Sequence, residues 1–192
     1  MAASFRTVIE VGADHLEQAR AVDRLFQDAI APATVNFDFE HIREAAAAVP
    51  GSEIVKMVRG WGLQENAPVM VMVLSLKEAV RQALPAEFAE AGFWETVEKE
   101  LVSAFTGLAA QEGAPGLSYY EEGADRTSYY RDLFFALQDA ESGEHLYAIA
   151  FCIDVTLGVD KARAGALEMT DVVPFAIRLN AIVLRQELLL AA

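Results

Sequence analysis

The chain has 192 residues, of which 54% are hydrophobic, 29 are acidic and 15 are basic, giving a net charge of -14. This length and apolar content suit one domain with a substantial core and exclude a disordered chain. The acidic excess disfavours nucleic acid and anionic lipid as partners, and the single cysteine excludes an internal disulfide and a cysteine-based metal cluster.

The N-terminus contains no recognisable signal peptide, because residues 1–17 lack an apolar stretch and soon become acidic. No uninterrupted apolar run reaches the roughly eighteen residues of a membrane-spanning helix. We therefore expect a protein that is made soluble in the cytoplasm, and any membrane role would need a rearrangement after synthesis.

The first elements in chain order are one strand and two helices. Period-two alternation in residues 5–11 predicts a short strand. A capping box at Asp14 and Glu17 predicts a helix that ends before Pro32. Asp38 is the expected N-cap of a second helix, which ends at the next proline.

Two longer amphipathic helices are expected after residues 53–62, which fit neither period. One runs from Pro68 to Leu84, although its β-branched start keeps a strand as an alternative. The other runs from Ala86 to Leu108. Their apolar faces should cover a sheet through Val73, Leu76, Val80, Trp94, Val97, Leu101 and Phe105.

Two strand-like runs follow around a polar turn, from Thr127 to Leu157. In the second run, large apolar residues alternate with small or polar ones: Tyr147, Ile149, Phe151, Ile153, Val155 and Leu157 against Ala148, Ala150, Cys152, Asp154 and Thr156. The first run sets Leu133, Phe135 and Leu137 against Tyr130, Asp132, Phe134 and Ala136. Because both faces are largely uncharged, these runs predict an interior antiparallel hairpin with helices on both sides. Further strands are expected at residues 164–169 and 178–186, with Pro174 between them.

A search for catalytic chemistry assigns no catalytic, cofactor-binding or metal-binding residue. The common nucleophile, metalloprotease, phosphate-binding and dinucleotide-binding motifs do not occur. Solvated positions at helix starts and turns account for His15, His41 and His145, and pairs such as Glu121-Glu122 and Asp38-Glu40 are typical of an acidic surface.

Several aromatic residues and the cysteine have two interpretations each. A lipid interface would suit Trp61, Trp94, Tyr119, Tyr120, Tyr129 and Tyr130, but Trp94 also fits a core and the tyrosine pairs fit strand ends. Cys152 fits a small buried hydrophobe among alanines, with a reactive or acylated thiol as the alternative.

The hairpin sequence resembles the Cyt-type cytolytic δ-endotoxins, a family of pore-forming toxins. The shared pattern surrounds FA(I/L)Q(D/N)A and comprises Thr127, Tyr129, Phe135, Ala136, Gln138, Ala140, Gly143, Tyr147 and residues 153–155. A second patch, residues 25–32 followed by Thr34 and Phe37, resembles the end of that family's first helix. The resemblance implies an α/β (α+β) cytolysin fold, one domain over residues 1–192, with a mostly antiparallel central sheet flanked on both faces by helical hairpins.

The resemblance also implies a membrane-permeabilising toxin or virulence factor that needs no cofactor and acts on target-cell membranes after release. Its partners would be phospholipid, zwitterionic rather than anionic, and further copies of itself on the membrane. The family's toxins are often trimmed at both ends from longer precursors, and we expect this chain to be close to the trimmed core.

Each run of the hairpin is long enough to cross a bilayer core of about 30 Å once the covering helices move aside. The candidates for insertion are Leu133, Phe134, Phe135, Leu137, Tyr147, Ile149, Phe151, Ile153, Val155 and Leu157. The weakly polar second face leaves both an ordered pore and a detergent-like disruption open. The other classes considered are a non-lytic protein of the same fold that binds a lipid or apolar ligand between helices and sheet, and an enzyme of unknown type.

Overall fold

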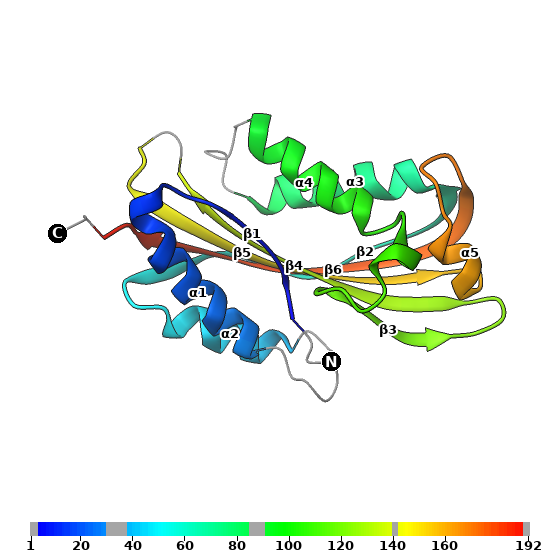
Figure 1. Ribbon diagram of the computed structural model, residues 1–192, viewed down its shortest axis with the longest axis horizontal. Helices are drawn as coiled ribbons and strands as arrows, with labels where there is room; N and C mark the ends of the chain where they lie inside the picture. The colour runs from blue at the N-terminus through cyan, green and yellow to red at the C-terminus, as the bar shows by residue number, and fades with distance from the viewer. Residues whose placement is uncertain (1–3, 30–37, 85–90, 140–141, 190–192) are drawn as a thin grey trace.

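The middle layer of the structure is a mixed sheet, seen nearly edge-on in Figure 1 of the computed structural model, which describes residues 4–29, 38–84, 91–139 and 142–189. Within these residues six strands form the sheet in the order β1-β4-β5-β6-β2, and β3 pairs with β4. The strands are β1 (Arg6–Glu10), β2 (Ser52–Pro68), β3 (Leu117–Glu122), β4 (Thr127–Gln138), β5 (His145–Leu157) and β6 (Val172–Glu187). Only the β1–β4 pair of this sheet is parallel.

Helices form the two outer layers (Figure 1). One face carries α1 (Leu16–Ala29) and α2 (Phe39–Ala48), which pack with the 3-10 helix η1 (Ala13–His15) at one end of the sheet. The other face carries α3 (Val69–Ala83) and α4 (Ala91–Ser103). Two short helices, η2 (Leu108–Gln111) and α5 (Lys161–Gly165), contact each other at the far end. This arrangement confirms the predicted sheet between helical hairpins.

The central hairpin is confirmed over its whole predicted length. Its antiparallel register runs without interruption from the Thr127–Leu157 pair to the Gln138–Leu146 pair. At the turn, the Asp139 amide donates to the carbonyl of His145 at 2.8 Å. Most residues on both faces of β4 and β5 are buried. The two uncharged faces predicted helices on both sides of the hairpin, and the structure confirms this.

Two strands lie where the sequence predicted none. The undecided segment 53–62 belongs to β2, an edge strand with register shifts between Ile54 and Lys56 and between Val58 and Trp61. These bulges interrupt the period-two pattern, which explains why the segment could not be assigned. The short strand β3 ends in exposed glutamates and has too few apolar positions to indicate a strand.

The prediction of a strand at residues 164–169 is wrong. The first two residues of this range end α5, in which the side chain of Asp160 accepts from the Arg163 amide at 2.8 Å and caps a helical turn, and residues 166–169 are neither helix nor strand. The next strand, β6, starts at Val172 and includes Pro174. Pro174 is paired with Asn66 of β2, and its carbonyl accepts from the Gly158 amide at 2.8 Å, so the proline lies near the start of the strand where pairing with β5 ends.

The helix predictions are mostly confirmed, with corrections at the ends. Asp38 caps α2 by accepting from the Glu40 amide at 3.0 Å, and the segment after Pro68 is helical rather than a strand. The capping box at Asp14 is wrong, because Gly12 is the N-cap of η1. The prediction that the fourth helix continues to residue 108 is also wrong, since α4 ends at Ser103, and its predicted start lies outside the described residues.

Candidate functional site

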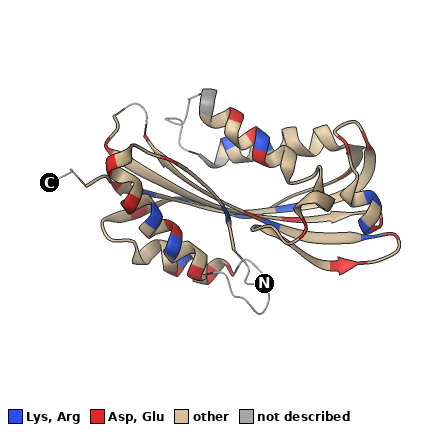
Figure 2. Ribbon diagram, viewed as in Figure 1, with Lys and Arg blue, Asp and Glu red and all other residues tan. Residues whose placement is uncertain are grey.

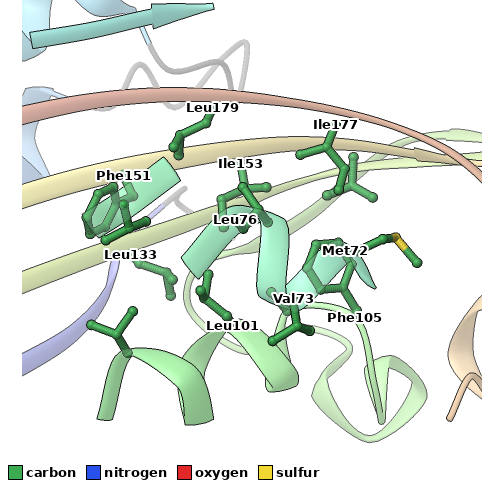
Figure 3. Close-up of a cluster of buried hydrophobic side chains, with 14 of the residues drawn as sticks. Met72, Val73, Leu76, Leu101, Phe105, Leu133, Phe151, Ile153, Ile177 and Leu179 are labelled. Atoms are coloured by element: carbon green, nitrogen blue, oxygen red, sulfur yellow. The ribbon is translucent and has the colours of Figure 1, made fainter. Parts of the chain in front are cut away.

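The apolar face of β4 and β5 lies beneath α3 and α4. Register pairs place Leu133 beside Phe151, and Phe135 beside Ile149. Nine of the ten insertion candidates share this face and its buried cluster: Leu133, Phe135, Leu137, Tyr147, Ile149, Phe151, Ile153, Val155 and Leu157. The sheet neighbour β6 extends the same face with further buried side chains, including Ile177 and Leu179 (Figure 3).

Phe134 is the insertion candidate that points the other way. It packs among the residues of the opposite cluster, with its ring 5.2 Å from that of Phe26 and 6.1 Å from that of Phe5. Alternation along a strand requires this, because Phe134 lies between two residues of the α3–α4 face. It anchors β1 and α1 to the sheet.

The predicted helix cover is in place over the apolar face. Buried side chains of α3 and α4 meet the strands, and Figure 3 shows Val73, Leu76 and Leu101 on this side of β4, β5 and β6. Val80, Val97 and Phe105 are buried in the same cluster. Trp94 is only half-buried, because its ring lies at the helix surface, 5.1 Å from the guanidinium carbon of Arg81 and 5.0 Å from the ring of Phe93.

Polar contacts fasten the end of α4 to the sheet. The Tyr129 hydroxyl donates to the carbonyl of Ala104 at 2.9 Å. Arg6 in β1 forms an ion pair with Glu100, whose side chain is almost completely buried. Arg131 donates from Nη2 to Ser103 Oγ at 3.2 Å. These bonds join α4 to both β1 and β4, so the cover cannot lift without breaking them.

Arg131 is a fully buried cation that the sequence analysis did not single out. Besides Ser103, its Nη2 donates to Gln111 Oε1 at 2.8 Å, whereas its Nε and Nη1 have no hydrogen-bond partner among the described residues. Burial and the nearby positive charge of Arg6 lower the pKa of Arg131, partly offset by Glu100. The available signal was the adjacent charged pair Arg131-Asp132 inside an otherwise apolar run with both faces buried.

Asp132 is the corresponding buried charge on the α1–α2 face. Its carboxyl is hydrogen-bonded to the thiol of Cys152, while its Oδ1 has no partner among the described residues. Burial raises the pKa of Asp132 to about 7. Cys152 is itself buried beside Ala148 and Ala150, which supports its interpretation as a small core residue.

The prediction that the tyrosine pairs lie at strand ends holds for Tyr129 and Tyr130 near the start of β4, whereas Tyr119 and Tyr120 lie in the middle of β3. The rings of Tyr119 and Tyr129 are tilted at 5.6 Å on the α3–α4 face. The rings of Tyr120 and Tyr130 are stacked at 4.5 Å on the opposite face. Trp61 is half-buried in β2.

Charged side chains lie mainly along the helices, turns and strand ends, and most of the sheet interior is uncharged (Figure 2). No cluster of three or more potential metal ligands occurs within the described residues. In the same residues, no helix combines the length and apolar character that crossing a membrane requires.

Comparison with known proteins identifies close structural relatives. A sequence profile described as Bacillus thuringiensis toxin matches residues 1–191. The type-2Aa cytolytic delta-endotoxin of Bacillus thuringiensis subsp. kyushuensis is 28% identical over 185 residues, which cover 96% of this chain and 71% of that protein.

Two solved structures share the fold over nearly the whole chain. A delta-endotoxin superposes with a TM-score of 0.92 at 28% identity, over 97% of this chain and 82% of that one. The activated Cyt2Ba monomer from Bacillus thuringiensis subsp. israelensis superposes with a TM-score of 0.89 at 24% identity, over 97% of this chain and 99% of that one.

Proposed function

This chain belongs to the Bacillus thuringiensis toxin family, and from that membership we propose that it is a cytolytic toxin that permeabilises phospholipid bilayers. Similarity to a cytolytic delta-endotoxin supports this function and does not favour the non-lytic lipid-binding alternative. The proposed action disrupts lipid packing after release onto a target membrane, and no step of it requires catalysis.

The continuous apolar face beneath α3 and α4 is the observation that carries the proposal. The strands that contribute to it have 12 residues in β4, 13 in β5 and 16 in β6. A tilted strand needs about 9–11 residues to cross a bilayer core, so each of these is long enough. Lifting α3 and α4 would expose large apolar side chains along all three strands at once.

Self-association on the membrane follows from backbone chemistry. In lipid, every strand amide and carbonyl must find a partner, because water is not present to replace a lost hydrogen bond. One copy leaves the outer edges of its sheet unpaired, so strands from further copies must complete the pairing. The net charge of -14 favours a zwitterionic over an anionic membrane as the surface that the protein first contacts.

A reversible lock between η2 and α5 tests whether the segment that follows α4 must separate from the sheet end during lysis. A Cβ built on Gly165 lies 3.0 Å from the Cβ of Ala109, so a disulfide between Ala109→Cys and Gly165→Cys needs only a small adjustment. Cys152 is buried elsewhere and stays in place. We expect the oxidised variant to release no dye from phosphatidylcholine vesicles and the reduced variant to match the wild type.

The matched control is the Ala109→Ser, Gly165→Ser variant, which has similar volume and cannot be crosslinked. It should lyse vesicles equally with and without reductant. Undiminished leakage from the oxidised lock would show that η2 need not separate from α5 during lysis. Absence of leakage by the wild type at every lipid composition and pH would overturn the lytic function itself, and native mass spectrometry would then show whether a lipid co-purifies.

A further inference from the structure

The edge strand β1 contacts both helical layers of the molecule. It lies first in the strand order and pairs in parallel with β4, from the Arg6–Leu133 pair to the Glu10–Leu137 pair. Successive side chains of a strand point to opposite faces. Its odd-numbered residues therefore face α1 and its even-numbered residues face α4, and these two helices belong to opposite layers (Figure 1).

Side chains of α1 hold one face of β1. Gln27 Oε1 accepts from the Phe5 amide at 2.8 Å, and Gln27 Nε2 donates to Thr7 Oγ1 at 2.9 Å. The Thr7 hydroxyl in turn donates to Asp23 Oδ1 at 2.9 Å. Phe5 is buried, with its ring 6.1 Å from that of Phe134. The helix α1 thus binds both the main chain and the side chains at the start of the strand.

Side chains of α4 hold the other face of β1. Arg6 donates from Nη2 to Glu100 Oε1 at 3.0 Å, and its Nε contacts the other carboxylate oxygen, so the ion pair is bidentate. At the far end of the strand, Glu10 Oε1 accepts from the Thr96 hydroxyl at 3.1 Å. Val8, between them, packs against the cluster beneath α3 and α4. Lifting α4 would break both polar contacts and uncover Val8.

The strand β1 is too short to hold its place by pairing alone. It has five residues, all of them at least partly exposed, and its strand partner within the described chain is β4. Parallel pairing is slightly weaker per residue than antiparallel pairing. Segments with few buried contacts and accessible backbone hydrogen bonds open most readily. Loss of α4 from one face should therefore release β1 from the sheet.

We propose that β1 is an interlock between the two helical layers, which leaves β4 whenever α4 lifts and resists that lifting while α1 holds it. Its departure uncovers the edge of β4 over residues 133–137 in the same step that exposes the apolar face of this strand. An unpaired edge invites pairing with another chain. The interlock keeps this edge closed until the cover opens.

The inference rests on the proposed function and adds an order of events to it. Edge and face of β4 open together, so one copy cannot pair with another through this edge while its apolar face is still covered. The contacts of β1 with α1 then contribute to the barrier against opening the opposite layer, although α1 does not cover the apolar face.

Thiol labelling measures the opening of α4 in the absence of a membrane. The reporter is Val97→Cys, at a buried position of α4, in a Cys152→Ala background. Gln27→Met removes the amide that holds β1 and keeps the side-chain length. We expect it to increase the labelling rate of the reporter about tenfold, the effect of losing one or two hydrogen bonds. Thr7→Val, which removes the hydroxyl between Gln27 and Asp23, should act in the same direction.

The matched control is Gln18→Met, which removes the same amide from the same helix. Gln18 donates to the carbonyl of Glu187 at 2.8 Å and accepts from the amide of Leu189 at 3.1 Å, at the end of β6 rather than in β1. These bonds stay intact when α4 leaves with β1, so the reporter should be labelled as in the unmodified background.

Two results would overturn the interlock. Equal acceleration by Gln27→Met and Gln18→Met would show that the reporter is labelled through general unfolding. An unchanged rate in both Gln27→Met and Thr7→Val would show that α4 opens without β1.

Dye release from phosphatidylcholine vesicles keeps the interlock and the lytic function apart. Gln27→Met should release dye faster than Gln18→Met, because it opens more often. The expected labelling difference without leakage from any of the proteins, the wild type included, would support the interlock and overturn the lytic function. Equal leakage rates of the two variants, despite different labelling rates, would overturn the role of the interlock in lysis.

Discussion

The two faces of the sheet use the same strands for different purposes. On the α3–α4 face, large apolar side chains line β4, β5 and β6 from end to end. On the α1–α2 face, alanine and Cys152 replace them in the middle of β5, and Asp154 and Thr156 follow toward its end. One face is therefore apolar along three strands, whereas the other has closely packed helices at one end and polar side chains at the other.

Two neighbouring residues of β4 place one buried ionisable side chain on each face of the sheet. Arg131 and Asp132 have opposite charges, but alternation points them to opposite faces, where they cannot form a direct ion pair across the sheet. Each is left with unpartnered polar atoms among the described residues. A buried polar atom without a hydrogen-bond partner lowers the stability of the folded protein. Each face of the sheet therefore contains one destabilising position within its core.

Truncating one buried side chain on each face, large on one and small on the other, should give the strongest contrast. Phe151→Ala should lower the free energy of unfolding by about 3–5 kcal/mol, because it opens a cavity beneath the helix cover. The adjacent Cys152→Ala, on the other face, should lower it by roughly 1 kcal/mol. Urea denaturation of both variants measures the difference, and equal losses would contradict the distinction between the two faces.

Asp132 should make the stability of the α1–α2 face depend on pH. Its folded pKa of about 7 exceeds the ordinary aspartate value of 3.8, so the folded state holds the proton more tightly. The stabilising contribution is complete below pH 3.8 and is lost as pH rises through 7. Above that pH the ionised carboxylate costs about 4 kcal/mol, at 1.4 kcal/mol for each unit of pKa shift.

The Asp132→Asn variant isolates this effect. At pH 8 it should be more stable than the wild type by several kcal/mol at most, and the difference should vanish toward pH 4. The pH dependence of the difference between the two urea denaturation curves is the relevant measurement, because other titrating groups cancel in it. A difference that stays constant from pH 4 to 8 would show that Asp132 does not titrate in the folded protein.

Arg131 should have a smaller effect, on the α3–α4 face. Arg131→Met keeps most of the side-chain volume and removes the unpartnered nitrogens, so we expect stability to rise by about 1 kcal/mol. Arg131→Ala leaves a cavity and should be destabilising. Thermal unfolding of the two variants separates the effect of removing the charge from the effect of removing side-chain volume. A large loss of stability in the methionine variant would show that the hydrogen bonds to Ser103 and Gln111 outweigh the cost of burying the charge.

Sequence periodicity was enough to predict those helices and strands whose apolar residues follow a single repeat without interruption. The β4–β5 hairpin alternates without a bulge, and the apolar stripe of α3 has helical spacing, so both elements could be assigned. The same alternation placed Cys152 in the core. The uncharged faces of the hairpin also predicted helices on both sides, and the family resemblance agreed with this layer order.

The remaining features depend on contacts between distant segments. Bulges in β2 follow its pairing with β6, and the short β3 gains its stability from β4. The burial of Arg131 depends on where η2 crosses the sheet, because Gln111 lies 20 positions away in sequence. The polar row through Tyr130, Asp154 and Arg178 exists only when three strands are in register, so no single stretch of sequence contains it.

The junction of β1 and β3 closes one edge of β4 to pairing with strands of other chains. Both strands pair with β4 on the same side, end to end, and Gly116 lies where they meet. A Cβ on Gly116 would be 2.4 Å from the carbonyl oxygen of Asp132 and 2.8 Å from the amide nitrogen of Arg6, so only glycine lets both strands close the edge. The outer edge of the apolar strand β4 is thus covered by two short segments, which prevents it from pairing with another chain.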